Sequence, residues 1–404
     1  MIKIPVLIAL LFTMLLNTQA QPGRWIGSLH RSDGNNIVFH FEWKKEKGKD
    51  AWYIRNAKES IRVDNMIRKG DSMIVHMPVF ESHFRIKVQP GKCEGVWIKG
   101  GAYKTQVMPF TAVPGKKRFN TSTAATKNIT GRWAVYFAGN KKEENSVGEF
   151  VQKGNIVHGT FLNASGDYRY QEGVVAGDSL FLSCFDGSHA YLFKALIADS
   201  ATITNGTFYA GATYTENWTA QKNSQATVPG ESVKMYLRPG EESLHFTFND
   251  LNGKPVSILD ERYKNKVVIV QLMGSWCPNC MDETAFLSSY YNNNKHRAVE
   301  VIALAYEYSA DWQRSVNSLT KIRQRFDVQY PILITGVPVT DSLRTEKTLP
   351  ELTPIRFFPS SVIIDKKGKV RKIDTDFVGP AAPEQHAAYT QHFEHYINEL
   401  LKEE

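Results

Sequence analysis

"KVVIVQLMGSWCPNCMDETAFLSSYY", residues 266–291, decides the fold of the second half of this chain. Its apolar, β-branched opening predicts a strand buried on both faces, and the part from Cys280 to Tyr291 repeats apolar residues at helical spacing. Cys277 and Cys280 lie three residues apart, where the predicted strand gives way to the predicted helix. They are two of only four cysteines in 404 residues, so their spacing calls for a chemical explanation.

Strands and helices alternate around this segment. In about the last 160 residues, apolar runs typical of strands alternate with apolar residues at helical spacing, and turn residues separate them. This pattern predicts both strands and helices. In order, these are a hairpin at 245–259, the buried strand, the cysteine-bearing helix, a strand at 298–307, a helix at 311–326, a strand at 330–334, a hairpin at 359–373 and a helix at 383–404. Such alternation predicts an α/β domain, a mixed sheet flanked by helices, over residues 243–404.

The front half of the chain contains an internal repeat. "GRWIGSLH" from Gly23 recurs as "GRWAVYFA" from Gly131, and three further pairs of segments follow in the same order. Both copies alternate apolar and polar residues in short runs separated by turn residues, which predicts antiparallel strands. We therefore expect a duplicated all-β meander, folded as a barrel or a sandwich, with units at 21–115 and 128–222 and a linker at 223–242.

The first twenty residues are typical of an export signal. Lys3 precedes an apolar core of twelve residues, and small residues lead to a predicted cleavage after Ala20, which removes residues 1–20. Twelve apolar residues are fewer than the roughly 20 that span a bilayer. We expect an exported, periplasmic protein, in a compartment where disulfides form and persist. The net charge of +8 contains no basic block, so no nucleic-acid partner is expected.

The Cys277–Cys280 pair has three candidate roles: a zinc site, a structural bridge or a redox centre. A structural zinc site requires four ligands, and the sequence offers neither a second cysteine pair nor a histidine close by. A bridge across so few residues restricts the unfolded chain little. At the start of a helix, unpaired N–H groups and the macrodipole favour the thiolate of Cys277. The pattern therefore indicates a redox pair, in which one sulfur attacks and the other resolves.

The other two cysteines, Cys93 and Cys184, lie in different repeat units at non-equivalent positions. Two alternatives remain open for them from the sequence: two buried thiols, or one bridge between the units. Export permits the bridge but does not require it.

Residues 246–401 resemble the TlpA-like thiol–disulfide oxidoreductases of the thioredoxin superfamily. The resemblance rests on "GSWCPNCMDE" at 274–283 and on "FPSSVIIDKKGKV" at 358–370. It implies a thioredoxin-like fold and dithiol–disulfide exchange, with no cofactor and no metal. Cys277 matches the nucleophile and Cys280 the resolving thiol, and together they would form the redox-active disulfide.

The same match implies further site residues. Glu283 matches the glutamate that exchanges a proton with the resolving thiol, which makes it a third catalytic candidate. Trp276 matches the aromatic residue beside the active site, and Pro359 matches the cis-proline that pairs with the substrate backbone. Phe358 is bulkier than the usual residue before that proline. Trp276, Phe358 and Pro359 are therefore the expected substrate-binding residues.

Two further positions depart from the family pattern. Asn279 stands where a second proline is usual between the cysteines. Gln271 stands on the strand position where thioredoxins keep a buried aspartate. An amide cannot carry a proton, so Glu283 is expected to be the available carboxylate.

These observations predict an exported thiol–disulfide oxidoreductase that reduces protein disulfides through Cys277 and Cys280. By analogy with the family, a membrane donor would supply its electrons. The alternative is an envelope protein whose duplicated β region binds a ligand or partner, with an accessory redox domain. A thiol peroxidase fits less well, because "SWCPNC" does not resemble a single peroxidatic cysteine in a proline-rich loop. The sequence leaves the oligomeric state open.

Overall fold

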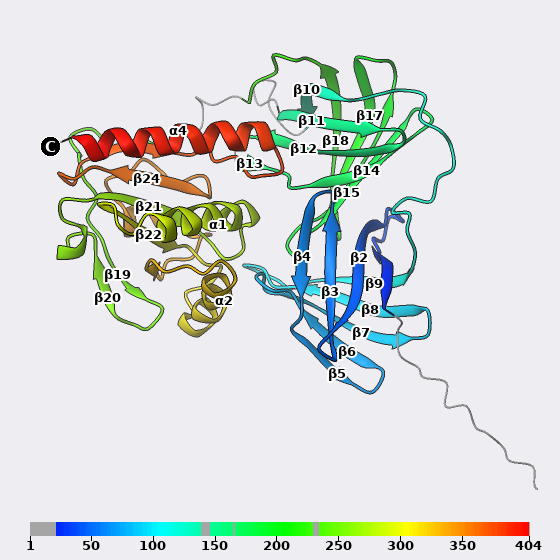
Figure 1. Ribbon diagram of the computed structural model, residues 1–404, viewed down its shortest axis with the longest axis horizontal. Coiled ribbons are helices and arrows are strands. Elements are labelled where there is room, and N and C mark those ends of the chain that lie inside the picture. Colours follow the sequence, from blue (N-terminus) through cyan, green and yellow to red (C-terminus); the bar gives the residue numbers. More distant parts are fainter. Residues whose placement is uncertain (1–21, 139–145, 165, 229–233, 404) are drawn as a thin grey trace, which may run out of the picture.

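The chain folds into three modules that pack against one another. A computed structural model describes residues 22–138, 146–164, 166–228 and 234–403, so the predicted signal peptide at 1–20 lies outside the described residues. Figure 1 shows two β units in the right half of the view and a sheet with helices in the left half. We call these the first β unit (β1–β9), the second β unit (β10–β18) and the C-terminal domain (β19–α4).

The first β unit is one antiparallel sheet of nine strands. They are β1 (Gly23–Leu29), β2 (Ile37–Glu46), β3 (Lys49–Asn56), β4 (Glu59–Val63), β5 (Met66–Lys69), β6 (Ser72–His76), β7 (Ser82–Gln89), β8 (Lys92–Lys99) and β9 (Gln106–Pro114). The order across the sheet is β4-β3-β2-β1-β9-β8-β7-β6-β5. The first and last strands thus pair in the middle, and β4 and β5 form the two edges of an open sheet.

The second β unit repeats this plan but closes. Its strands are β10 (Gly131–Phe137), β11 (Ser146–Lys153), β12 (Ile156–Asn163), β13 (Gly166–Asp167), β14 (Gln171–Ala176), β15 (Ser179–Phe185), β16 (Ala190–Ile197), β17 (Thr202–Ala210) and β18 (Tyr214–Lys222). The order is β11-β10-β18-β17-β16-β15-β14-β12-β13, and an additional β11–β12 pairing joins the sheet into a barrel. Closure removes both edges, as in small up-and-down barrels. The predicted all-β antiparallel fold is therefore confirmed.

Aromatic side chains fill the interior of each β unit. Strand alternation places every second residue inside, and these positions are rich in tryptophan and phenylalanine. The fully buried ones include Trp25, Trp43, Trp52, Trp97, Phe39, Phe41 and Phe84 in the first unit, and Trp133, Trp218 and Phe161 in the second. Cys93 and Cys184 are separate buried thiols, which decides between the two alternatives left open by the sequence.

Three residues of the second β unit, Phe185, Ala190 and Leu192, belong to the hydrophobic core of the first. Phe185, at the end of β15, is fully buried and stacks on Phe39 with ring centroids 4.3 Å apart. The amide of Asn56 donates to the carbonyl of Phe185 (2.8 Å) and accepts from its N–H (3.2 Å). The two units therefore share a hydrophobic core as well as a surface.

The C-terminal domain has a mixed seven-stranded sheet. Its elements are β19 (Thr247–Asp250), β20 (Pro255–Ser257), the short 3-10 helix η1 (Glu261–Tyr263), β21 (Val267–Met273), α1 (Pro278–Asn293), β22 (Val299–Ala305), α2 (Trp312–Arg325), β23 (Ile332–Ile334), α3 (Arg344–Thr348), β24 (Ser360–Ile364), β25 (Val370–Asp374) and α4 (Pro383–Lys402). Strands β21, β22 and β23 are parallel, and the outer strands are antiparallel. The predicted α/β thioredoxin-like fold is confirmed. The short helix α3 has too few residues to show a period, and the sequence does not predict it.

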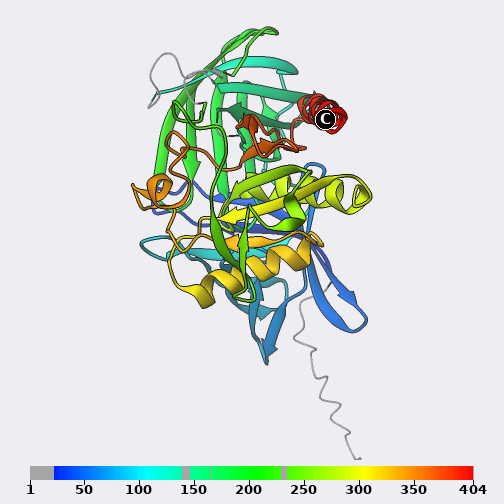
Figure 2. The ribbon, with the colours of Figure 1, turned by 90° about the vertical axis from the view of Figure 1, so that its left-hand side faces the viewer.

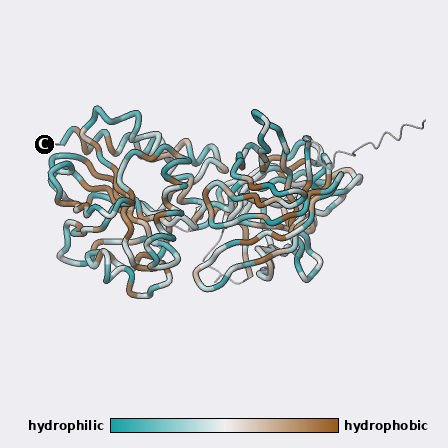
Figure 3. The backbone as a smooth tube through the Cα atoms, turned by 90° about the horizontal axis from the view of Figure 1, so that it is seen from below, coloured by the Kyte–Doolittle hydropathy of each residue, from teal (hydrophilic) through white to brown (hydrophobic). Residues whose placement is uncertain are grey.

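The central strand β21 is buried on both faces, as its unbroken apolar run predicted. Alternate residues face two hydrophobic clusters: Ile269 lies with residues of α1, α2 and α4, and Val270 lies with residues around α3 and η1. Figure 3 shows hydrophobic segments running through the middle of the C-terminal domain and of the β units. Figure 2 views the molecule from the side of the C-terminal domain, with the β units behind it. Among the described residues, no helix is both long and apolar enough to cross a membrane.

Candidate active site

The cysteine pair lies at the N-terminus of α1, directly after β21 and its short connecting loop. Cys277 is the N-cap residue of α1, and its Sγ accepts a hydrogen bond from the N–H of Cys280 (3.1 Å). Pro278 occupies the first turn, where its missing N–H costs nothing. A disulfide joins the two cysteines. Cys280 is fully buried, while Cys277 keeps 4% of its surface exposed, so an incoming sulfur can reach only Cys277.

The predicted substrate-binding residues surround Cys277. The Phe358–Pro359 peptide bond is cis, and the carbonyl oxygen of Phe358 lies 3.5 Å from the Sγ of Cys277. The ring of Trp276 meets Phe358 edge-on, with centroids 5.7 Å apart, and stacks on Tyr308. Its Nε1 donates to the carbonyl of Tyr306 (2.8 Å). The structure therefore brings all three residues together at the exposed side of the disulfide.

Glu283 is buried one helical turn beyond Cys280. Gln271 donates to its Oε2 (2.9 Å) and Ser361 donates to its Oε1 (3.0 Å). Gln271 and Ser361 are opposite residues of the paired strands β21 and β24, so the sheet fixes both donors. Burial raises the pKa of Glu283 to about 8, and the two hydrogen bonds offset only part of this effect. A carboxyl with such a pKa holds or releases a proton near neutral pH, as general acid–base chemistry requires.

A second buried carboxyl supports the loop before the cysteines. Glu307, just after β22, accepts hydrogen bonds from the N–H and the hydroxyl of Ser275. Burial raises the pKa of Glu307 to about 7. No signal in the sequence points to this role, because Glu307 lies outside the cysteine motif and joins it only through the parallel pairing of β21 and β22.

The second β unit also contacts the cysteine motif directly. The hydroxyl of Ser188 donates to the carbonyl of Trp276 (3.3 Å), and the amide of Asn279 donates to the carbonyl of Asp167 (3.1 Å). Asn279 is the residue that departs from the usual second proline. A proline there has no side-chain donor, so the departure has a structural reason: the position between the cysteines binds the neighbouring module.

Arg169 joins all three modules beside the active site. Its buried guanidinium lies 2.6 Å from Glu59 of the first β unit and 3.7 Å from Asp186 of the second, and it pairs with Asp282 of α1. Burial alone would lower the pKa of Arg169, but Glu59 and Asp186 raise it above its ordinary value. Its backbone has a φ of +63°, which is uncommon for a long side chain and marks a special position. No local sequence motif identifies this residue.

A cavity of about 500 Å³ opens beside Cys277, between the second β unit and the C-terminal domain. One wall consists of active-site residues of the C-terminal domain, among them Cys277, Trp276 and Phe358. The facing wall comes from the end of the barrel and is mostly aromatic and polar. It is formed by Asn163, Asp167, Tyr168, His189, Tyr191, Phe208, Ala210, Tyr214 and Glu216.

Known proteins resemble the C-terminal part of the chain. Residues 238–390 match the family model described as Redoxin. The thiol-disulfide oxidoreductase ResA of Bacillus thuringiensis subsp. konkukian is 28% identical over 131 residues, covering 32% of this chain and 66% of the relative. ResA of a Bacillus cereus strain is 28% identical over 158 residues, covering 39% of this chain and 80% of the relative. The chain thus spans slightly less than two thirds of the first of these relatives.

Among solved structures, a thiol:disulfide interchange protein of the thioredoxin family from Chlorobium tepidum TLS is similar. It is 18% identical with a TM-score of 0.30, and the match covers 41% of this chain and 99% of that one.

Proposed function

Because the C-terminal part of this chain belongs to the TlpA-like thiol–disulfide oxidoreductases, as its sequence predicted, we propose that the whole protein is an exported reductase of protein disulfides. The observation that carries the proposal is the Cys277–Cys280 disulfide at the start of α1, with only Cys277 reachable from solvent. Export rests on the sequence of residues 1–20 alone.

In the proposed reaction, the reduced protein transfers two electrons to a substrate disulfide. The Cys277 thiolate attacks one substrate sulfur, forming a mixed disulfide while the other substrate sulfur leaves and takes up a proton. Cys280 then loses its proton and attacks the Sγ of Cys277, which releases the second substrate thiol and leaves the enzyme disulfide. A dithiol donor, proposed to be a membrane protein by family analogy, returns the enzyme to its dithiol form.

Three residue roles support this reaction. Glu283 would accept the proton of Cys280, because it lies in the same buried region with a pKa near neutral pH. The segment at Phe358–Pro359 would align the substrate backbone beside Cys277. Trp276 would provide an apolar surface against which the substrate packs.

The test uses two variants and a matched control. Cys277→Ser should abolish the reduction of urea-scrambled ribonuclease A by the chemically reduced protein, because the remaining thiol of Cys280 is buried. Cys280→Ser should accumulate mixed disulfides that resolve only on adding dithiothreitol. Cys93→Ala, which removes a buried thiol from the core of the first β unit, should keep wild-type turnover. Normal turnover by Cys277→Ser would overturn the proposal.

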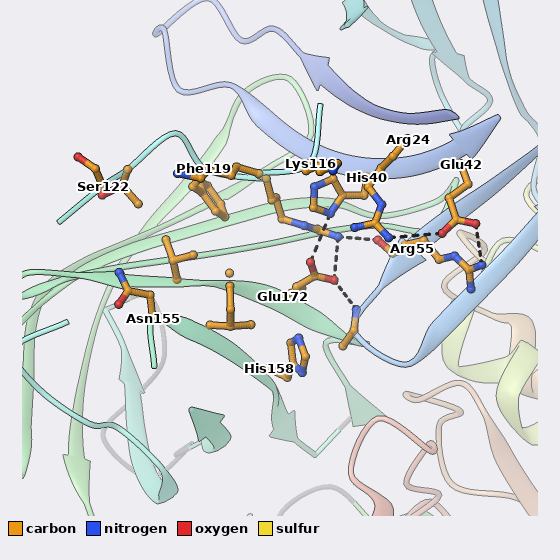
Figure 4. Close-up of a pocket in the computed structure, with 17 residues that line it drawn as sticks. Arg24, His40, Glu42, Arg55, Lys116, Phe119, Ser122, Asn155, His158 and Glu172 are labelled. Carbon is orange, nitrogen blue, oxygen red and sulfur yellow. Dashed lines mark hydrogen bonds and ion pairs between the residues drawn. The ribbon is translucent and has the colours of Figure 1, made fainter. Parts of the chain in front are cut away.

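A second candidate function is the binding of an anionic ligand by the β units. A cavity of about 720 Å³ lies between them and is lined by five cations and two carboxylates: Arg24, Arg55, Lys116, Lys117, Arg118, Glu42 and Glu172. Figure 4 shows Arg24, Arg55, Lys116, Glu42 and Glu172 in this cavity. The carboxylates are already held: Glu172 by Arg118 (3.2 Å) and Glu42 by Arg55 (3.1 Å). An excess of cations in a concave site attracts anions.

Calorimetric titration with pyrophosphate tests this second function. Replacing Lys116 and Lys117 by glutamine should weaken any binding, whereas the same change at Lys366 and Lys367, in the turn before β25, should not. Absence of measurable binding by wild type would remove this candidate and leave the reductase proposal untouched.

A further inference from the structure

The wall facing Cys277 does not belong to the domain that carries the cysteines. Tyr168, Tyr191 and Phe208 of the second β unit line the cavity opposite Cys277 and Phe358. In thiol–disulfide exchange the incoming sulfur must approach the attacked one along an open path. Here the space beside Cys277 lies between two modules, so residues of the barrel line the approach to its sulfur.

The barrel is held at this position by buried polar contacts. Arg169 binds carboxylates from all three modules, and Asn279 binds the backbone of Asp167. A third contact is the hydrogen bond from the N–H of Gly379, before α4, to the carboxylate of Asp167 (3.0 Å). Because breaking a buried ion pair is costly, these contacts oppose movement of the barrel away from the C-terminal domain.

The size of the cavity limits what can enter. A volume of about 500 Å³ lies in the range of sites that enclose drug-sized ligands. Cys277, with 4% of its surface exposed, has its residual accessibility inside this space. A disulfide on a rigid folded surface would have to bring neighbouring elements into the gap, whereas a flexible segment needs room only for a few side chains.

The chemistry of the barrel wall adds a preference. Tyr191 packs against Phe208 edge-on with centroids 5.1 Å apart, and His189 stacks on Tyr191 at 4.4 Å. Together with Tyr168 and the exposed Tyr214, these rings form an aromatic surface facing Trp276 and Phe358. Such surfaces favour an aromatic partner.

We propose that the second β unit forms half of the substrate site and restricts the enzyme to disulfides carried on flexible, extended peptide segments, with preference for an aromatic residue next to the cysteine. This selectivity rests on the proposed reductase function. Folded proteins with rigid disulfides would be excluded, because the space between the two walls, about 500 Å³, has no room for their neighbouring elements.

Substrate comparison tests the proposal on the full, chemically reduced chain. The substrates are an unstructured peptide disulfide with phenylalanine beside each cysteine, the same peptide with glycine there, and ribonuclease A in its native and its urea-scrambled forms. The phenylalanine peptide should have a kcat/KM about tenfold above the glycine peptide, as expected for one aromatic contact. Scrambled ribonuclease should be reduced and native ribonuclease should not.

A cavity-filling variant tests the wall itself. Ala210 lines the cavity from β17, and Ala210→Trp should lower kcat/KM for the phenylalanine peptide by about tenfold or more, because the larger side chain takes up space that the substrate needs. Thr215 lies on the neighbouring strand β18 and is exposed, so Thr215→Trp should behave as wild type. Circular dichroism checks folding, and Ala210→Leu replaces the variant if tryptophan prevents it.

The outcomes separate this inference from the proposed function. If no substrate at all is reduced, the reductase function fails. If native and scrambled ribonuclease are reduced equally fast, or Ala210→Trp leaves the peptide rate unchanged, reduction stands and the substrate restriction is overturned.

Discussion

Glu283 should make the stability of the oxidised protein fall as pH rises. Burial raises the pKa of its carboxyl from 4.5 to about 8. Between these two values the folded protein holds a proton that the unfolded chain has released. The stabilising contribution is therefore complete below about pH 4.5 and is lost at about 1.4 kcal/mol per pH unit until about pH 8.

The size of the effect follows from the same two values. The rise from 4.5 to about 8 corresponds to about 5 kcal/mol over the whole range. Between about pH 5.5 and about pH 7.5 the free energy of unfolding of wild type should fall by about 3 kcal/mol more than that of Glu283→Gln, which cannot titrate. Glu307 has a raised pKa as well, but it is present in both proteins, so its contribution cancels in the difference.

The assay is urea denaturation of both oxidised proteins at the two pH values. Glu261→Gln serves as the control, because Glu261 is largely exposed and its loss should leave the wild-type pH dependence unchanged. Equal pH dependence of wild type and Glu283→Gln, within the roughly 10–15% error of extrapolated free energies, would refute the assignment of a raised pKa to Glu283.

Three further changes test how the modules are held together. Asn279→Ala should weaken the docking of the second β unit by about 1 kcal/mol, the value of one hydrogen bond, and hydrogen exchange of the residues around Asp167 should become faster. Arg169→Met should destabilise the protein by about 3–5 kcal/mol, because it leaves buried carboxylates unpaired; adding Asp282→Asn should restore part of the melting temperature. Phe185→Ala should cost about 3–5 kcal/mol in urea denaturation, as expected for an emptied aromatic site, and a loss below about 1 kcal/mol would show that the shared core is unimportant.

Most of the C-terminal fold was predictable because its signals are local. The apolar run of β21 and the helical spacing after Cys280 each lie within one short stretch. The cysteine motif was likewise recognisable from the sequence, because its residues are neighbours in the chain. The strand meander of each β unit was recognisable from period-two alternation, although the shortest strands, such as β13 with two residues, leave no pattern to detect.

The contacts between modules could not be predicted. Arg169 and Asp282 are far apart in the chain and share no motif, so only the folded chain brings them together. The same holds for Ser188 and Trp276. Asn279 stands out in the sequence as a departure from relatives, but its partner, the carbonyl of Asp167, is a backbone atom that every residue has. Contacts to backbone leave no trace in the identity of the partner residue.

The open sheet of the first β unit and the intrusion of Phe185 give the duplicated region an asymmetry. The first sheet is open, with edges at β4 and β5, and its core includes the ring of Phe185 from the second unit. The second sheet closes into a barrel. The two units are therefore not interchangeable, although their strand orders correspond. Deleting the second unit would remove Phe185 from the core of the first unit and would also remove the residues that face Cys277 across the cavity.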